Sequence, residues 1–176
     1  RPSLECQLPA TIGTNSATDA GGSVIITVDP TGNVYARPTW ASNLNPGDIC
    51  SISLVFQAHD AITWTPLVPS INWSLPASTY AQFSFLQQGN TVFVSGMLEC
   101  ISNGFTPTNT PVGTFPSYAP TTTAQFVVFS GGPAGSQSGN PFVLVMRPDT
   151  LATLTGNSYI SNNAPDYIRV SGIYYL

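Results

Sequence analysis

The sequence contains no lysine, and only 7% of its 176 residues are charged, against about 25% in an average soluble protein. Its four basic residues stand far apart: Arg1, Arg37, Arg147 and Arg169. No basic stripe can therefore follow a phosphate backbone, which excludes nucleic acid as a partner. The eight acidic residues are scattered as well, so the net charge of −4 bears on solubility and indicates no partner.

Cysteine, histidine and long apolar runs are also scarce. Three widely spaced cysteines fit neither a disulfide-dense scaffold nor a zinc knuckle, and we expect thiols at Cys6, Cys50 and Cys100. The single histidine, His59, stands beside Asp60 at the polar end of an apolar run. A convergence of Asp48 with these two residues stays open, but no calcium-loop motif supports it. We expect no metal, no other cofactor and, without an apolar run of about 18 residues, no membrane insertion.

The chain is rich in apolar and aromatic residues. Hydrophobic residues make up 42%, with nine Phe, seven Tyr and three Trp, which excludes intrinsic disorder. The length suits one domain over 1–176. Sixteen prolines and fifteen glycines interrupt every stretch long enough for a stable helix, so the chain is predicted to be all-β.

Two hairpins are predicted from strand-like runs that flank turn residues. The pairs are Val24–Val28 with Asn33–Arg37, and Tyr80–Gln88 with Thr91–Cys100. The first turn is Asp29–Gly32; the second is Gly89-Asn90, where glycine supplies the positive φ of a primed turn. Further strands are predicted at Ile49–Gln57, Ala124–Phe129, Phe142–Arg147, Ala152–Thr155 and Tyr167–Tyr175.

These elements predict an antiparallel β-sandwich of about eight to ten strands, with jelly-roll connectivity as one option. Strand order does not follow from the pattern. The segment Asn103–Thr123, rich in Thr and Pro, is expected to be an ordered surface loop or a crossover between sheets.

No recognised catalytic spacing is present. Gly135–Gly139 resembles a nucleophile elbow, but its central residue is Gln137 instead of serine. Most acids stand beside Gly, Pro or Asn, where turns use aspartate for local hydrogen bonds. We therefore expect no enzyme, with a glycoside hydrolase or esterase kept as the less favoured alternative.

A series of strand and turn signals follows over the last two thirds of the chain. It consists of Trp64-Thr65-Pro66, Tyr80, Gly89–Gly96, Pro111–Pro116, Tyr118, Pro120, Phe142–Asp149 and Ile168–Tyr174. This order resembles the C-terminal tip domains of bacteriophage tail fibres and receptor-binding proteins. The resemblance implies a β-sandwich, commonly a homotrimer, that lies at the virion surface and binds a host saccharide or surface protein without performing chemistry.

The first third, Arg1–Ala58, departs from that pattern because it looks like additional β-structure and not like a coiled or spiral shaft. This keeps open a second viral class, the protruding or spike domain of a small eukaryotic virus capsid. In either class the chain is expected to be the C-terminal part of a longer structural protein. A trimer favours the tail-fibre class, and a dimer favours the capsid spike.

Loops are the expected binding surface, because loop side chains have no duty in the core. Three segments combine an aromatic with polar groups that suit a sugar: Pro38–Asn45, Asn103–Tyr118 and Ser158–Tyr167. The predicted contacts to a host-cell glycan or other surface receptor are Trp40, Asn43, Phe105, Asn109, Tyr118, Asn162 and Asp166.

Overall fold

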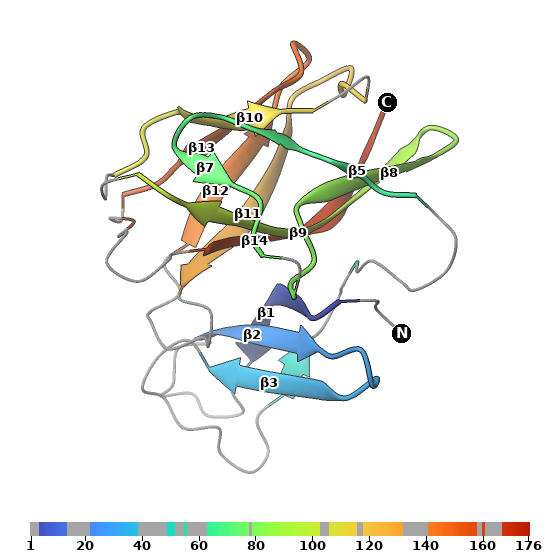
Figure 1. Cartoon of the computed structure of the whole chain (residues 1–176), viewed down its shortest axis with the longest axis vertical. Helices are drawn as coiled ribbons and strands as arrows, with labels where there is room; N and C mark the ends of the chain where they lie inside the picture. The colour runs from blue at the N-terminus through green and yellow to red at the C-terminus, as the bar shows by residue number, and fades with distance from the viewer. Residues whose placement is uncertain are drawn as a thin grey trace.

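A computed structural model describes residues 4–13, 22–38, 49–51, 55, 63–77, 79–102, 106–115, 118–131, 141–157, 160 and 167–176. The described part of the chain forms two sheets, in which every pair of neighbouring strands is antiparallel. The all-β antiparallel prediction is confirmed (Figure 1).

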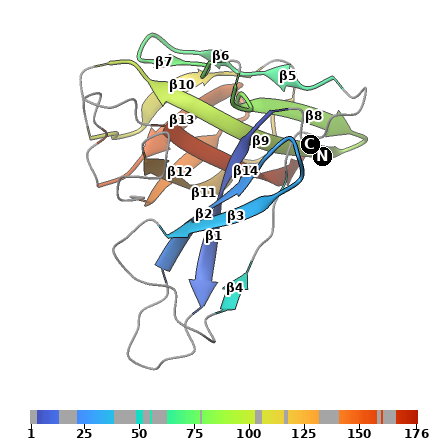
Figure 2. The ribbon, with the colours of Figure 1, turned by 60° about the horizontal axis from the view of Figure 1, so that its bottom comes forward.

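The N-terminal sheet has four strands in the order β3-β2-β1-β4. Their bounds are Cys6–Gly13 for β1, Gly22–Val28 for β2, Val34–Pro38 for β3 and Ile49–Ser51 for β4. Figure 2 shows this sheet lying across the side of the larger sheet on which β14 runs. The sequence did not predict β1, because Pro9 inside it lowers strand propensity.

The first predicted hairpin is confirmed as β2 and β3. A backbone hydrogen bond from Gly32 N to Asp29 O (3.0 Å) closes the turn, and Gly32 has a φ of 94°. The Asp29 carboxylate accepts hydrogen bonds from Thr31 Oγ1 (2.6 Å), Thr31 N (2.9 Å) and Asn33 N (2.9 Å). These bonds, the Thr31 hydroxyl foremost, hold the pKa of Asp29 well below its usual 3.8.

The main sheet has ten strands within the described residues. They are β5 (Thr65–Pro66), β6 (Val68–Pro69), β7 (Trp73–Ser74), β8 (Ser84–Gln88), β9 (Thr91–Cys100), β10 (Thr110–Thr114), β11 (Ala124–Gly131), β12 (Pro141–Met146), β13 (Leu151–Thr155) and β14 (Tyr167–Tyr175). Their order is β5-β8-β9-β14-β11-β12-β13-β10-β6, and β7 pairs with β9.

This order nearly closes the sheet into a barrel-like arrangement with one seam. β5 pairs with β8 and β6 with β10, so the two edges of the sheet are joined by one continuous segment through Leu67. Leu67 N donates to Phe83 O (2.9 Å) on one side, and Ser70 N donates to Val112 O (3.0 Å) on the other. Strands β11 to β14, in the spatial order β14-β11-β12-β13, form a Greek key.

The second predicted hairpin is confirmed as β8 and β9. Gln88 faces Thr91 across a two-residue turn. Gly89 has a φ of 60°, as the first position of a primed turn requires. The predicted strands at Ala124–Phe129, Phe142–Arg147, Ala152–Thr155 and Tyr167–Tyr175 correspond to β11, β12, β13 and β14. Of the predicted strand Ile49–Gln57, Ile49–Ser51 is confirmed as β4; apart from Val55, the rest lies outside the described residues.

The expectation of a loop or crossover over Asn103–Thr123 is wrong for its middle, where β10 pairs with β13. The register shifts between Pro111 and Gly113, and this irregularity accommodates a proline inside a strand. Val112 and Phe115 are buried in the core, which outweighs the low strand propensity of their neighbours.

The principal core lies inside the curled main sheet. Side chains alternate along each strand, so Val92, Val94 and Leu98 of β9 point inward together with Phe85 and Phe142. Burial of each such side chain contributes about 1.5–3 kcal/mol before the entropy of ordering is subtracted. Cys100 belongs to this core, and Cys6 is buried with Leu8 and Ala81 where the N-terminal sheet begins. The side chain of Cys50 lies outside the described residues.

Candidate binding surface

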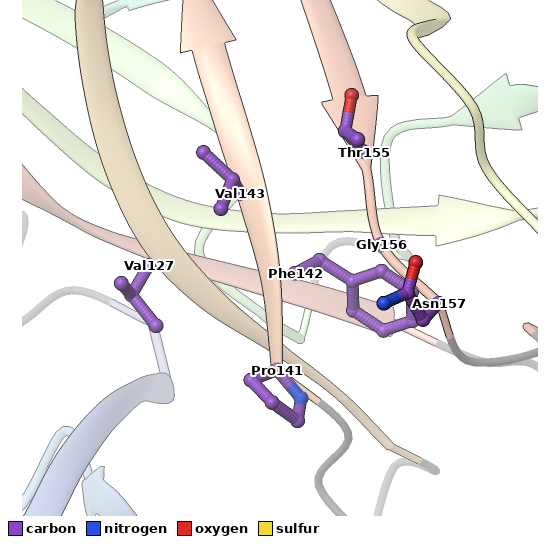
Figure 3. Close-up of a pocket in the computed structure, with 7 residues that line it drawn as sticks. All are labelled: Val127, Pro141, Phe142, Val143, Thr155, Gly156 and Asn157. Atoms are coloured by element: carbon purple, nitrogen blue, oxygen red, sulfur yellow. The ribbon is translucent and has the colours of Figure 1, made fainter.

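A hollow of about 440 Å³ lies on the outer face of the main sheet, over strands β11, β12 and β13. Its base is a row of three residues that face one another across the strands, Val127, Val143 and Thr155. The other lining residues in the described part of the chain are Pro141, Phe142, Gly156 and Asn157. Figure 3 shows Val127 on one side, Thr155 and Asn157 on the other, and Val143 and Pro141 between them.

Gly156 shapes the floor of the hollow at the end of β13. A Cβ at this position would collide with the ring of Phe142, so only glycine lets the backbone lie directly on that ring. Gly156 N donates to Pro107 O (3.0 Å), which fixes the segment from Pro107 to Asn109 beside the hollow. The segment ends with Asn109 in a left-handed conformation, at a φ of 56°.

Asn109, a predicted contact residue, is joined by its backbone to the lining residue Thr155 and is not itself among the described lining residues. Its backbone N–H donates to Thr155 Oγ1 (3.1 Å), and its side chain is exposed. A threonine hydroxyl has one donor hydrogen and two acceptor lone pairs. Because the Asn109 N–H occupies one lone pair of the Thr155 hydroxyl, the hydroxyl hydrogen of Thr155 remains to donate a second hydrogen bond.

Tyr118, also predicted as a contact, is half-buried against the principal core. Its backbone carbonyl accepts a 2.6 Å hydrogen bond from the hydroxyl of Tyr174. Burial, followed by the nearby Tyr118, raises the pKa of Tyr174 above its usual value. The structure thus gives the Tyr118 backbone a role in packing and does not bring its side chain together with Asn109.

The other predicted contact residues lie outside the described residues: Trp40, Asn43, Phe105, Asn162 and Asp166. His59 and Asp60 lie outside them as well. Sequence reasoning missed the hollow itself. Its signal was weak, because Val127, Val143 and Thr155 are ordinary outward positions of strands whose pairing brings them together only in the folded sheet.

The described side chains that line the hollow are uncharged. None of its seven lining residues has a side chain that ionises near neutral pH. Thr155 and the Asn157 carboxamide supply hydrogen-bonding groups, and the valines and Pro141 supply apolar walls. Such a lining can hold and orient a small uncharged group, and it contains no general acid, general base or carboxylate nucleophile.

A second feature of the outer face is a set of cross-strand rows over β8, β9 and β14. The rows are Ser84–Ser95–Ser171, Leu86–Phe93–Ile173 and Gln88–Thr91–Tyr175. The serine row is covered by Val55, whose carbonyl accepts from Ser95 Oγ (2.8 Å) and whose N–H donates to Ser171 Oγ (2.8 Å). Two serines thereby hold the backbone of one residue, Val55, against the main sheet.

Beyond the serine row, the completely buried Arg169 connects the two sheets by hydrogen bonds. Arg169 Nε and Nη2 donate to Gln7 Oε1 on β1 (3.0 and 2.7 Å), and Nη1 donates to Gly131 O (3.0 Å). Gln7 Nε2 in turn donates to a carboxylate oxygen of Glu5 (2.8 Å). A carboxamide therefore links a buried cation to a carboxylate, which offsets part of the cost of burying the charge.

The acidic residues of the described part serve local structure. Asp29 binds its own turn, Asp149 pairs with Arg147 (2.9 Å) at the surface, and Glu5 accepts from Gln7. Glu99 faces Tyr167 across β9 and β14; burial, with Glu99 next in weight, raises the pKa of Tyr167 above its usual value. Among the described residues, no cluster of three or more His, Cys, Asp or Glu side chains could hold a metal ion.

The open part of this outer face is uncharged and combines the polar Gln88 and Thr91 with four large apolar or aromatic side chains. Ile173 is 44% exposed and Tyr175 is 63% exposed, while Leu86 and Phe93 are half-buried beside them. These four residues are called the apolar row below. They lie on the same outer face of β8, β9 and β14 as the serine row, in the next two rows along these strands.

The comparisons with known proteins found no family model that matches the chain and no match among curated proteins. In the part of the chain that the structure describes, no helix is long and apolar enough to cross a membrane.

Proposed function

We propose that this chain is a non-catalytic attachment domain at a virion surface, which binds a saccharide of the host-cell surface. The observation that carries the proposal is the hollow over β11–β13, where Thr155 and Asn157 stand beside the apolar Val127, Val143 and Pro141. Binding sites for small ligands combine such apolar walls with a few placed hydrogen-bonding groups. The resemblance to tail-fibre tip domains supports the viral setting.

The absence of ionisable groups from the lining supports binding without chemistry. Glycoside hydrolysis needs two carboxyl groups on either side of one bond, and acyl transfer needs an activated nucleophile. The seven residues around the hollow include neither. A ligand held there is oriented and released unchanged.

Self-association supports attachment by raising avidity. A single shallow site binds a saccharide weakly, and several copies held in one particle multiply the effective affinity. The scarcity of charge and the exposed apolar row favour contact between copies, because the centres of protein interfaces are poor in charge and rich in aromatic residues. We expect a homotrimer.

The test is an array of host-type glycans and cell surfaces probed with the purified chain, displayed in several copies on a bead to restore avidity. The expected result is retention on a restricted group of glycans that a soluble glycan of the same group competes away. Uniform absence of binding to glycans and cells would contradict the proposed function and leave a purely structural role in the particle.

A further inference from the structure

We infer that the hollow over β11–β13 binds the acetamido group of an uncharged N-acetylhexosamine. The inference rests on the proposed function and adds to it the chemical class of the ligand and the part of the ligand that is recognised. Figure 3 shows the arrangement on which it depends, with Val127, Val143 and Pro141 toward one side and Thr155 and Asn157, beside the ring of Phe142, toward the other.

The apolar wall suits a methyl group. Val127 is 61% exposed, Pro141 is exposed and Val143 is half-buried, so apolar surface faces solvent inside the hollow. A sugar that carries only hydroxyl groups would set polar atoms against this wall, at a cost in desolvation. The methyl of an acetamido group covers the same wall favourably.

The polar wall suits an amide. Thr155 accepts from Asn109 N (3.1 Å), so its own hydrogen is left to donate to a ligand carbonyl. The Asn157 carboxamide both donates and accepts, which matches the N–H and C=O of an acetamido group. One substituent therefore meets both walls, since it carries a methyl and an amide on adjacent atoms.

The charge around the site favours a neutral sugar. None of the lining residues is cationic, and the chain as a whole has a net charge of −4. An acidic sugar that also bears an acetamido group, such as a sialic acid, would find no arginine among the seven described lining residues to pair with its carboxylate. The site is therefore expected to favour a neutral N-acetylhexosamine over a sialic acid, although both carry the same acetamido group.

The experiment compares the methyl glycosides of N-acetylglucosamine and N-acetylgalactosamine with those of glucose and galactose, which differ from them at the acetamido group. Saturation-transfer NMR on the intact chain should give the acetamido methyl protons the largest signal. Titration should give at least about tenfold tighter binding than for the parent hexoses, the range that one well-placed group supplies. A sialic acid glycoside should bind more weakly than the neutral amino sugars.

Variants with matched controls locate the site. Val127→Asp and Thr155→Val should each weaken binding at least fivefold. Asn157→Ala, at an exposed position, should weaken binding as well. Val68→Asp, at 62% exposure on β6, and Thr114→Val, exposed on β10, make the same replacements elsewhere and should leave binding unchanged. Thermal melting of each variant separates a lost site from a lost fold.

Equal binding of hexoses and N-acetylhexosamines overturns the inference, as does unchanged affinity in folded variants of the hollow. If the folded hollow variants still bind the glycans that the array identifies, saccharide binding stands at another surface and this inference fails. If the array detects no glycan at all, the saccharide function and this inference fall together.

Discussion

Arg169 and Gln7 show how a residue pair 162 positions apart joins the two sheets. We predict that Gln7→Leu destabilises the protein by about 3 kcal/mol, because it removes the acceptor of two hydrogen bonds and leaves a guanidinium buried. Urea unfolding followed by tryptophan fluorescence measures the change.

The double variant Gln7→Leu with Arg169→Met provides the control. Replacing both partners by apolar residues removes the buried charge, so it should restore most of the stability lost in the single variant. If the double variant is as unstable as the sum of the single ones, the pair is not the coupled contact described above.

The lowered pKa of Asp29 gives a prediction about the stability of the protein at acidic pH. The carboxylate has a pKa below its usual 3.8 in the folded chain, so its contribution to stability is present above that value and is lost as the pH falls toward the folded pKa. We expect Asp29→Asn to flatten the fall in stability between about pH 5 and pH 2. Parallel stability profiles for the parent and the variant would show that the turn bonds do not favour the ionised form.

Among the elements, β9 runs close to the backbone of Gln82 at Gly96. Gly96 has a φ of 119°, and a Cβ there would collide with the backbone of Gln82 and lie 2.8 Å from Phe83 N. We predict that Gly96→Ala costs about 3 kcal/mol or more. The segment Ala81–Phe83 is bonded to Met97 on β9 through Met97 N to Ala81 O and Phe83 N to Met97 O (both 2.9 Å), so it cannot move away without breaking these hydrogen bonds.

Gly89→Ala is the matched comparison at the other end of the same hairpin. Gly89 has a φ of 60°, but nothing lies within 4 Å of a Cβ built on it. The substitution should cost only about 1 kcal/mol of conformational strain. Equal effects of the two substitutions on the midpoint of urea unfolding would contradict the crowding assigned to Gly96.

Element prediction succeeded where the signal is local. Gly89-Asn90 and Asp29–Gly32 each determine a turn and, through it, the register of two strands. It failed at Cys6–Gly13 and Thr110–Thr114, because prolines inside these segments lower strand propensity while burial and distant pairing partners stabilise the strands.

The binding surface was less predictable for a related reason. Asn109 was predicted from its polar loop, and its backbone N–H donates to the lining residue Thr155, but the described lining comes from positions whose meeting depends on strand order. A pattern of alternation gives the outward face of each strand and leaves open which strands are neighbours. The buried Arg169 was unpredictable too, since its partner Gln7 lies at the far end of the sequence.

At the scale of the molecule, the apolar row is the surface through which we expect copies to associate. Ile173→Lys should shift the protein toward monomer, because it sets a charge in an uncharged contact. Val68→Lys, at a similarly exposed site on β6, should not. Light scattering gives the mass: a parent protein of 18.6 kDa at micromolar concentration would contradict self-association, and a dimer would favour the capsid-spike class.

Binding without chemistry leaves the mass of the ligand unchanged, and the mass of a ligand recovered after binding can be measured. The chain is incubated with a mixture of neutral N-acetylated oligosaccharides, washed, denatured, and its retained ligand is identified by mass spectrometry. We expect the parent protein to retain some of the oligosaccharides with their masses unchanged. The Val127→Asp variant should no longer retain them, whereas the Val68→Asp variant should. Retention of nothing, or recovery of shortened or deacetylated sugars, would contradict binding without chemistry.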